Sequence, residues 1–246
     1  MAPSLTAAQG RPAPPSAEKR TRHRRWRWGI IGLFGLVAAA HAPILRGLAR
    51  ALIIDDPAPS AGCVLVLDVD CRFDRAAEMY HSGTASRILV IDRPATRLVR
   101  LGVVSSVREQ SLRELSRRDV SSRDVILLPG SDKTPWHIAH ALQAWLLEHP
   151  TEHVLVLCRR FSGRNLRFVA SNVMQPGEVQ RLAFRDMPDH RYSETNWWLN
   201  RAGVRALTGA LCNLVYDALH GEDTATANEF DPDEYERELR FLVQEK

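Results

Sequence analysis

The sequence of 246 residues is poor in cysteine, and its four cysteines include no C-x-x-C pair: Cys63, Cys71, Cys158 and Cys212. Cys63 and Cys158 lie within apolar runs, where a free thiol behaves as a small hydrophobic side chain. The spacing therefore predicts core residues and argues against a disulfide framework or a zinc ribbon. A pairing of two cysteines stays open if the domain is exported.

Glycine-rich phosphate-binding signatures are also missing. Neither G-x-G-x-x-G nor G-x-x-x-x-G-K-[ST] occurs in the chain, so the two commonest nucleotide-binding loops are not encoded. No internal repeat is present, which argues against a solenoid or a propeller. With 45% hydrophobic and 25% charged residues, the chain has the composition of one globular domain with appendages.

Charge is unevenly distributed along the chain. The net charge of +4 combines a basic head with an acidic tail, because residues 221–246 hold nine acidic against three basic residues. The head, residues 1–25, is rich in proline, alanine, serine and arginine, a composition typical of disordered segments. The basic face on a folded domain that nucleic-acid binding requires is not predicted.

A hydrophobic segment follows the head at residues 26–46. The only polar side chain of its apolar stretch is His41, and the stretch lies at the short end of the length that spans a bilayer. Trp26 and Trp28 stand at the interfacial position beside arginines that obey the positive-inside rule. The pattern predicts a single-pass plasma (inner) membrane helix, with the N-terminus cytoplasmic and the domain extracytoplasmic. A cleaved signal peptide and a buried helix are the alternatives.

Residues 53–220 alternate between short apolar runs and stretches with helical periodicity. Continuous apolar runs that alternate with helices are typical of a mostly parallel sheet covered on both faces. We expect an α/β domain with three-layer, Rossmann-like architecture. The predicted strands are 63–67, 87–91, 125–128, 153–158 and 179–184, and the predicted helices are 73–81, 107–117, 135–148, 164–173 and 196–219.

Polar residues follow four of the predicted strands. In a parallel sheet the carboxyl ends of the strands meet at one edge, where ligands bind. Any strand end also needs polar residues to reach water, so ordinary loop chemistry is the competing interpretation. The four groups are Asp68, Asp70 and Arg72; Asp92 and Arg93; Ser131, Asp132, Lys133 and Thr134; and Arg159, Arg160, Ser162 and Arg164.

Four blocks carry a resemblance: "PAPSAGCVLVLDVDCRFDRAAEMYHSG", "RRDVSSRDVILLPGSDKT", "VLVLCRRFSGRNLRF" and "WWLNRAGVRALTGALCNLVY". In their order and spacing they resemble the ElyC/SanA/YdcF family of bacterial envelope proteins. The resemblance extends over roughly residues 53–219. It implies a YdcF-like α/β domain, of a kind often held by an N-terminal membrane segment.

The sequence departs from that family at residues of its polar site. Asp68 and Val69 replace paired glycines, which weakens phosphate cradling by the backbone. Ser162 replaces a histidine, and a hydroxyl without a base is a poor proton shuttle. A glutamate and a lysine of the last helix fall on Ala210 and Asn213. Either the chemistry is re-sited on the aspartates after the first strand, or the chain binds without turnover. The catalytic candidates are Asp68, Asp70 and Ser162.

Three further patterns have both a functional and a structural interpretation. His137 and His140 have the spacing of two zinc ligands on one helix face, and also that of ordinary helix histidines. A serine hydrolase needs G-x-S-x-G, whereas "RFSGR" around Ser162 lacks the first glycine. Trp197 and Trp198 either wall a ligand pocket or pack at the rim of the core.

The arginines at positions 159, 160 and 164 form the strongest functional pattern. Guanidinium groups there suit phosphate or carboxylate recognition, and a solubilising turn is the alternative. We expect a membrane-anchored envelope protein that binds, and in one version processes, a phosphorylated peptidoglycan or lipid-carrier intermediate. The alternatives are a catalytically silent scaffold or regulator of envelope biogenesis, and a nucleotide- or S-adenosylmethionine-type binder. The sequence identifies no cofactor. The ligand-binding candidates are Arg72, Ser131, Lys133, Thr134, Arg160, Arg164 and Trp197.

The acidic tail, residues 221–246, ends in an amphipathic pattern. Asp231 is a suitable N-cap and Pro232 suits the first helical position. Tyr235, Leu239 and Leu242 then fall on one stripe of a helix. We expect an acidic linker followed by a short helix that docks on the domain or on a partner. A solvated tail with transient helix is the alternative.

Overall fold

The computed structural model describes residues 41–57, 61–67, 73–131 and 133–222. The chain divides into two compact units, Met1–Arg46 and Gly47–Lys246. The described residues of the first unit, 41–46, are helical. The predicted disordered head and most of the predicted membrane helix lie outside the described residues. Within the described ranges, no helix combines the length and the hydropathy that are needed to cross a membrane.

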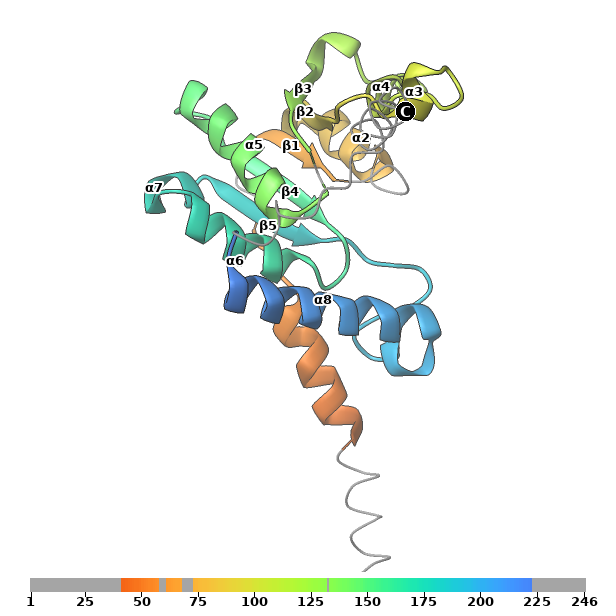
Figure 1. Cartoon of the computed structure of the whole chain (residues 1–246), viewed down its shortest axis with the longest axis vertical. Helices are drawn as coiled ribbons and strands as arrows, with labels where there is room; N and C mark the ends of the chain where they lie inside the picture. Colours follow the sequence, from red (N-terminus) through yellow and green to blue (C-terminus); the bar gives the residue numbers. More distant parts are fainter. Residues whose placement is uncertain (1–40, 58–60, 68–72, 132, 223–246) are drawn as a thin grey trace, which may run out of the picture. The chain divides into compact units, whose positions relative to one another are not determined.

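The described residues of the second unit form one sheet of five parallel strands in the order β3-β2-β1-β4-β5 (Figure 1). The central strand β1 pairs with β2 on one side and with β4 on the other. The prediction of an α/β fold with a parallel sheet is confirmed. The strands are β1 Ala61–Val66, β2 Ala85–Asp92, β3 Val125–Pro129, β4 Val154–Cys158 and β5 Leu182–Asp186.

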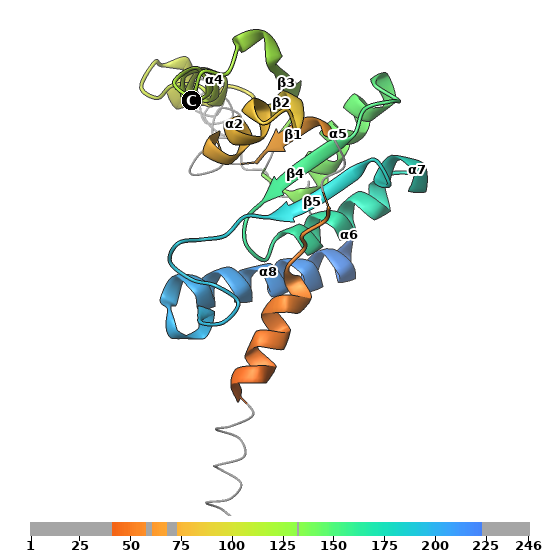
Figure 2. The ribbon, with the colours of Figure 1, turned by 180° about the vertical axis from the view of Figure 1, so that it is seen from behind.

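Helices cover both faces of the sheet, which gives the three layers that the alternating pattern predicts. The helices α5 and α6 pack on one face, and α2 and α4 pack on the other (Figures 1 and 2). The helix α8 lies against α6 in the outer part of the first layer. The helices are α2 Phe73–His81, α3 Arg97–Arg100, α4 Val107–Ser116, α5 Pro135–Glu148, α6 Gly163–Val173, α7 Pro176–Val179 and α8 Arg201–His220.

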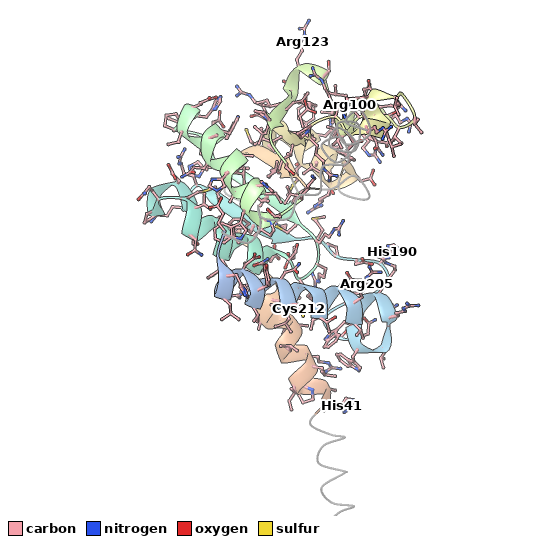
Figure 3. The ribbon with its side chains drawn as sticks, in the orientation of Figure 1. His41, Arg100, Arg123, His190, Arg205 and Cys212 are labelled. Atoms are coloured by element: carbon pink, nitrogen blue, oxygen red, sulfur yellow. The ribbon has the colours of Figure 1, made fainter. Side chains whose placement is uncertain are left out.

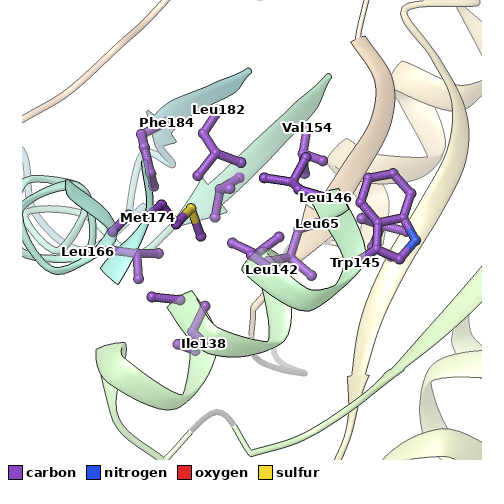
Figure 4. Close-up of a cluster of buried hydrophobic side chains, with 14 of the residues drawn as sticks. Leu65, Ile138, Leu142, Trp145, Leu146, Val154, Leu166, Met174, Leu182 and Phe184 are labelled. Carbon is purple, nitrogen blue, oxygen red and sulfur yellow. The ribbon is translucent and has the colours of Figure 1, made fainter. Parts of the chain in front are cut away.

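Two apolar clusters hold the layers together, one on each side of the sheet. In the larger cluster Leu65 of β1 and Val154 of β4 pack against Leu142 and Leu146 of α5 (Figure 4). Alternate residues of the same strands, such as Val64, face the other cluster. Because both faces of each inner strand are buried, the strands had to be apolar throughout, and this is why their sequence shows runs instead of alternation.

The cysteines divide into two environments. Cys63 in β1 and Cys158 in β4 are buried thiols, as the sequence predicts. Burial raises the pKa of the Cys63 thiol to about 12, and the nearby carboxylate of Glu152 adds to the increase. The extension of this prediction to Cys212 is wrong, because Cys212 is exposed on α8. Cys71 lies outside the described residues.

Two element boundaries differ from the sequence prediction near the end of the domain. Residues Pro176–Val179 form a helical turn, because Glu178 accepts a hydrogen bond from the backbone N–H of Gln175 in a capping box. The last strand therefore begins at Leu182 instead of residue 179. The long helix begins at Arg201 instead of residue 196, because Asn200 caps it by accepting from the N–H of Ala202 at 2.8 Å.

A short segment before β1 is fastened along the outer edge of β5. Backbone hydrogen bonds join Asp186 to Ile54 and Asp56 to Phe184, at 2.8 and 3.0 Å. The carboxylate of Asp55 pairs with Arg185 at 2.9 Å, and that of Asp56 pairs with Arg167 of α6. Residues 53–56, which we call the edge segment, are therefore held by both backbone and charge.

Candidate functional site

The carboxyl ends of the five strands define the candidate site. The strand order reverses beside β1, so the crevice between the loops after β1 and β4 is where sheets of this kind bind ligands. The loop after β1 holds Asp68, Asp70 and Arg72, which lie outside the described residues. The described part of the candidate site consists of the β3 and β4 loops and the elements that surround them.

The polar residues after β3 serve the start of α5. Ser131 accepts a hydrogen bond from the backbone N–H of Lys133 at 3.2 Å. Thr134 caps α5 by accepting from the N–H of His137 at 3.3 Å, and its hydroxyl also lies 2.9 Å from Nδ1 of His137. Pro135 occupies the first turn, as is usual for a helix start. The side chain of Lys133 is exposed.

The arginines after β4 have different environments. Nη2 of Arg160 lies 2.5 Å from Oε2 of Glu194, in a pair whose side chains are 15% and 32% exposed. Glu194 thus neutralises the guanidinium that was expected to bind an anion. Arg164, in the first turn of α6, is exposed. Ser162 donates its hydroxyl to the backbone carbonyl of Arg159 at 2.9 Å.

An aspartate that the sequence reasoning missed lies at the N-terminus of α6. Oδ1 of Asp186 accepts a hydrogen bond from the N–H of Gly163 at 2.8 Å, and Oδ2 accepts from the N–H of Ile54 at 3.1 Å. A Cβ on Gly163 would lie 2.7 Å from Oδ1. The only signal for Asp186 in the sequence is its place at the end of a strand, and other polar residues of the chain end strands in the same way.

Burial sets the protonation of that aspartate. Desolvation raises the pKa of Asp186 to about 6, although the hydrogen bonds from Ile54 and Gly163 and the charge of Arg160 oppose the increase. The carboxylate is therefore ionised at neutral pH and sits where the partial positive charge of α6 is greatest. Asp186 occupies the position that an anionic ligand of α6 would take.

The β4–α6 corner contains a strained residue, but it is not the serine. Phe161 has φ of 74° and is fully buried, stacked on Tyr192 with 5.8 Å between ring centroids. A hydrolase elbow places its nucleophile in the strained position of the strand-to-helix turn. Here that position presents a phenyl ring to the core, while Ser162 is in the right-handed region.

A second buried carboxylate joins three helices beside the candidate site. Asp217 of α8 accepts from Nε1 of Trp136 in α5 at 3.0 Å and from Nδ2 of Asn165 in α6 at 2.8 Å. Oδ1 of Asn165 is buried without a hydrogen-bond partner. The first turns of α5 and α6 are thus brought together through α8.

The loops that carry Thr134 and Arg164 follow β3 and β4, which are three positions apart in the sheet. The axes of these two strands are therefore about 14 Å apart.

The remaining candidates have structural partners. His137 contacts Thr134, and His140 lies 2.7 Å from the carboxylate of Glu222. Within the part of the chain that the structure describes, no group of three residues could hold a metal ion. Trp197 is buried and packs edge-to-face on Trp198. This arrangement corresponds to the packing interpretation of the tryptophan pair.

Comparisons with known proteins give no match to this chain. No family model matches it, and neither a curated protein nor a solved structure matches it. The fold and the described part of the candidate site define a parallel α/β domain whose described helix termini at the carboxyl edge are occupied by the chain's own polar side chains.

Proposed function

We propose that the chain is a divergent protein of the ElyC/SanA/YdcF type that acts as a catalytically silent scaffold or regulator of cell-envelope biogenesis. The observation that carries the proposal is the carboxylate of Asp186, which accepts the hydrogen bond of Gly163 N–H at the start of α6. In an enzyme or phosphate binder of this architecture, a ligand would accept that bond. An internal anion therefore takes the ligand's place and repels a second anion.

The geometry around Ser162 supports an absence of turnover. Its hydroxyl donates its proton in a hydrogen bond to the backbone carbonyl of Arg159. The same proton is the one that a general base would have to accept from a nucleophilic serine. The strained position of the corner belongs to Phe161, and Arg160 is neutralised by Glu194. These contacts give the corner a structural role, because the Ser162 hydroxyl, the Asp186 carboxylate and Nη2 of Arg160 all bond within the chain, while Nε of Arg160 is buried without a hydrogen-bond partner.

The edge segment holds the start of the domain against its sheet. Residues 53–56 come directly after the helical residues 47–52 and are fastened to β5 by the pair Asp55–Arg185 and to α6 by the pair Asp56–Arg167. We propose that the hydrophobic segment 26–46 is retained as a plasma-membrane anchor with the domain on the extracytoplasmic side. A retained anchor would keep a scaffold and its partners close to the bilayer.

Two binding functions compete with this proposal, and each rests on one observation. Arg164 is exposed in the first turn of α6, which favours a binder of a phosphorylated envelope intermediate. Asp92 ends β2 beside β1 and its side chain is 30% exposed. An acidic residue at the end of the second strand binds ribose in dinucleotide-binding sheets, so this position favours a nucleotide- or S-adenosylmethionine-type binder.

Thermal unfolding of the full chain in detergent separates the three functions. We expect no increase in Tm with undecaprenyl phosphate, sugar phosphates, adenine nucleotides or S-adenosylmethionine, and no release of phosphate from the phosphorylated compounds. An increase with phosphorylated compounds that Arg164→Ala abolishes would replace the scaffold by the phosphate binder. An increase with adenosine compounds that Asp92→Asn abolishes would replace it by the nucleotide-type binder.

A further inference from the structure

The outer surface of α8 is unusually apolar for a helix that faces solvent. Of its 20 residues only Gly203, Leu207 and Asp217 are buried. No charged residue occurs between Arg205 and Asp217, although the exposed face of a surface helix is normally polar. The exposed apolar side chains are Val204 at 38%, Val215 at 52%, Tyr216 at 47% and Leu219 at 75%.

The exposed apolar side chains form a stripe along α8. Three of them, Val204, Val215 and Leu219, share one side of the helix with the half-buried Leu211, because the four residues are spaced by seven, four and four positions. The exposed thiol of Cys212 lies next to this stripe; Figure 3 labels it and Arg205 along the helix. We call this stripe, with Cys212, the outer face of α8. Its spacing is that of a helix that packs on another helix.

The chain itself supplies a segment of matching pattern directly after α8. Tyr235, Leu239 and Leu242 are spaced by four and three residues and follow the cap pattern of Asp231 and Pro232. Segment 231–246 lies outside the described residues. Its sequence nevertheless has one apolar stripe that a helix would need to bury.

The tether between the two stripes has the right length. Glu222 is fixed near the end of α8 by its contact with His140 at 2.7 Å. Residues 223–230 then span up to roughly 27 Å when extended, whereas a helix is only about 10 to 12 Å wide. A short tether holds its segment at an effective concentration in the millimolar range. This concentration favours the tail over a second copy of the chain.

The tether also sets the direction of the segment. A segment that begins close to Glu222, beside the end of α8, covers the outer face only where it runs back toward Arg201, so the two helices are antiparallel. We propose that segment 231–246 docks as an antiparallel helix on the outer face of α8 and covers its apolar stripe.

Disulfide trapping in the full chain tests this proposal. In the antiparallel arrangement position 242 lies opposite Cys212, within the Cα separation that a disulfide needs. The variant Leu242→Cys should therefore form an intramolecular disulfide with Cys212 under mild oxidation, seen as a faster-migrating monomer and as a linked peptide in mass spectrometry. The matched control Arg240→Cys lies on the opposite side of the predicted helix and should remain mostly reduced.

Maleimide labelling of Cys212 provides a second measurement without any change in the tail. Labelling should be slow in the full chain and fast in a variant that ends at Glu222 and still unfolds cooperatively. Equal trapping of the two cysteine variants, or trapping of neither, would overturn the proposal. Disulfide dimers through Cys212 in the unsubstituted chain would assign the face to a second copy, and protection of Cys212 that appears only with lipid vesicles would assign it to the membrane.

Discussion

Asp186 and Gly163 are joined by a hydrogen bond of 2.8 Å between the carboxylate of the last residue of β5 and the first backbone N–H of α6. The two residues are 23 positions apart, and the bond brings the edge of the sheet to the helix that follows β4. It also fixes a negative charge at the helix N-terminus, where it stabilises the helix dipole. A residue of the chain itself therefore supplies the negative charge at the N-terminus of α6.

Stability should depend on pH through Asp186. Its pKa is raised from 3.8 to about 6 in the folded chain, so the folded state binds the proton more tightly and loses stability as pH rises from 3.8 to 6. At 1.36 kcal/mol per pKa unit, the loss is about 3 kcal/mol. Relative to the unsubstituted chain, Asp186→Asn should become more stable by up to this amount between pH 4 and pH 7.5, as urea unfolding will show.

Asp189 offers a control of the opposite sign. The hydrogen bond from Arg191 lowers the pKa of Asp189 from 3.8 to about 2. Asp189 therefore makes its full contribution to the free energy of unfolding above pH 3.8, and this contribution is lost only as the pH falls toward 2. The difference in unfolding free energy between Asp189→Asn and the unsubstituted chain should be constant between pH 4 and pH 7.5. The assignment to Asp186 would be wrong if the two variants gave the same pH profile.

A methyl group on Gly163 should disrupt the same bond. The added Cβ would meet Oδ1 of Asp186 at 2.7 Å, and Asp186 is too firmly held to withdraw without losing a hydrogen bond. Gly163→Ala should therefore lower the free energy of unfolding by about 1–3 kcal/mol. Gly177→Ala is the matched control, because nothing lies within 4 Å of its Cβ position, and it should be neutral or slightly stabilising. Equal effects of both variants would contradict the close approach.

Asp217 should be essential for the packing of α8. Asp217→Ala leaves the indole N–H of Trp136 and the amide of Asn165 without their acceptor, and each buried unsatisfied donor costs about 1–3 kcal/mol. Asn213→Ala, an exposed change on the same helix, should alter stability by no more than about 0.5 kcal/mol. Urea unfolding of the two variants measures the difference. A loss of less than about 1 kcal/mol in Asp217→Ala would show that the junction is not held by this carboxylate.

Arg160 and Arg164 of the β4–α6 corner should differ in how much each contributes to stability. Arg160→Ala removes the partner of Glu194 and the packing of a side chain that is only 15% exposed, so it should lower stability by about 1.5–3 kcal/mol. Arg164→Ala changes an exposed side chain and should leave stability within about 0.5 kcal/mol. Thermal unfolding will distinguish them. A destabilising Arg164→Ala with a neutral Arg160→Ala would reverse these roles.

The fold was predictable because its signal is local. The apolar run Val64–Val66 indicates a strand, and the periodicity of residues 135–148 indicates a helix, without reference to any distant part of the chain. The bounds of α2 and α5 agree with the prediction. The capping box at Gln175 and the Asn200 cap were short polar signals beside longer apolar ones, so the boundaries of β5 and α8 were misplaced.

The candidate site was less predictable because its defining contacts join distant positions. Asp186 meets Gly163 and Ile54, and Arg160 meets Glu194, across separations of 23 to 132 residues. A single sequence gives no indication that two such residues meet. The arginine pattern was visible, but its neutralisation by Glu194 depends on the path of the chain after β5.

The state of the Asp186 carboxylate tests the central claim most directly. In the full chain labelled with ¹³C at aspartate carboxyl groups, the Asp186 signal, assigned with Asp186→Asn, should titrate with a midpoint of about 6, and inorganic phosphate should not move it. A midpoint near 3.8 would show that Asp186 is not buried at the N-terminus of α6. A signal displaced by phosphate at neutral pH would show that this N-terminus is open to an external anion, and either result would contradict the scaffold function.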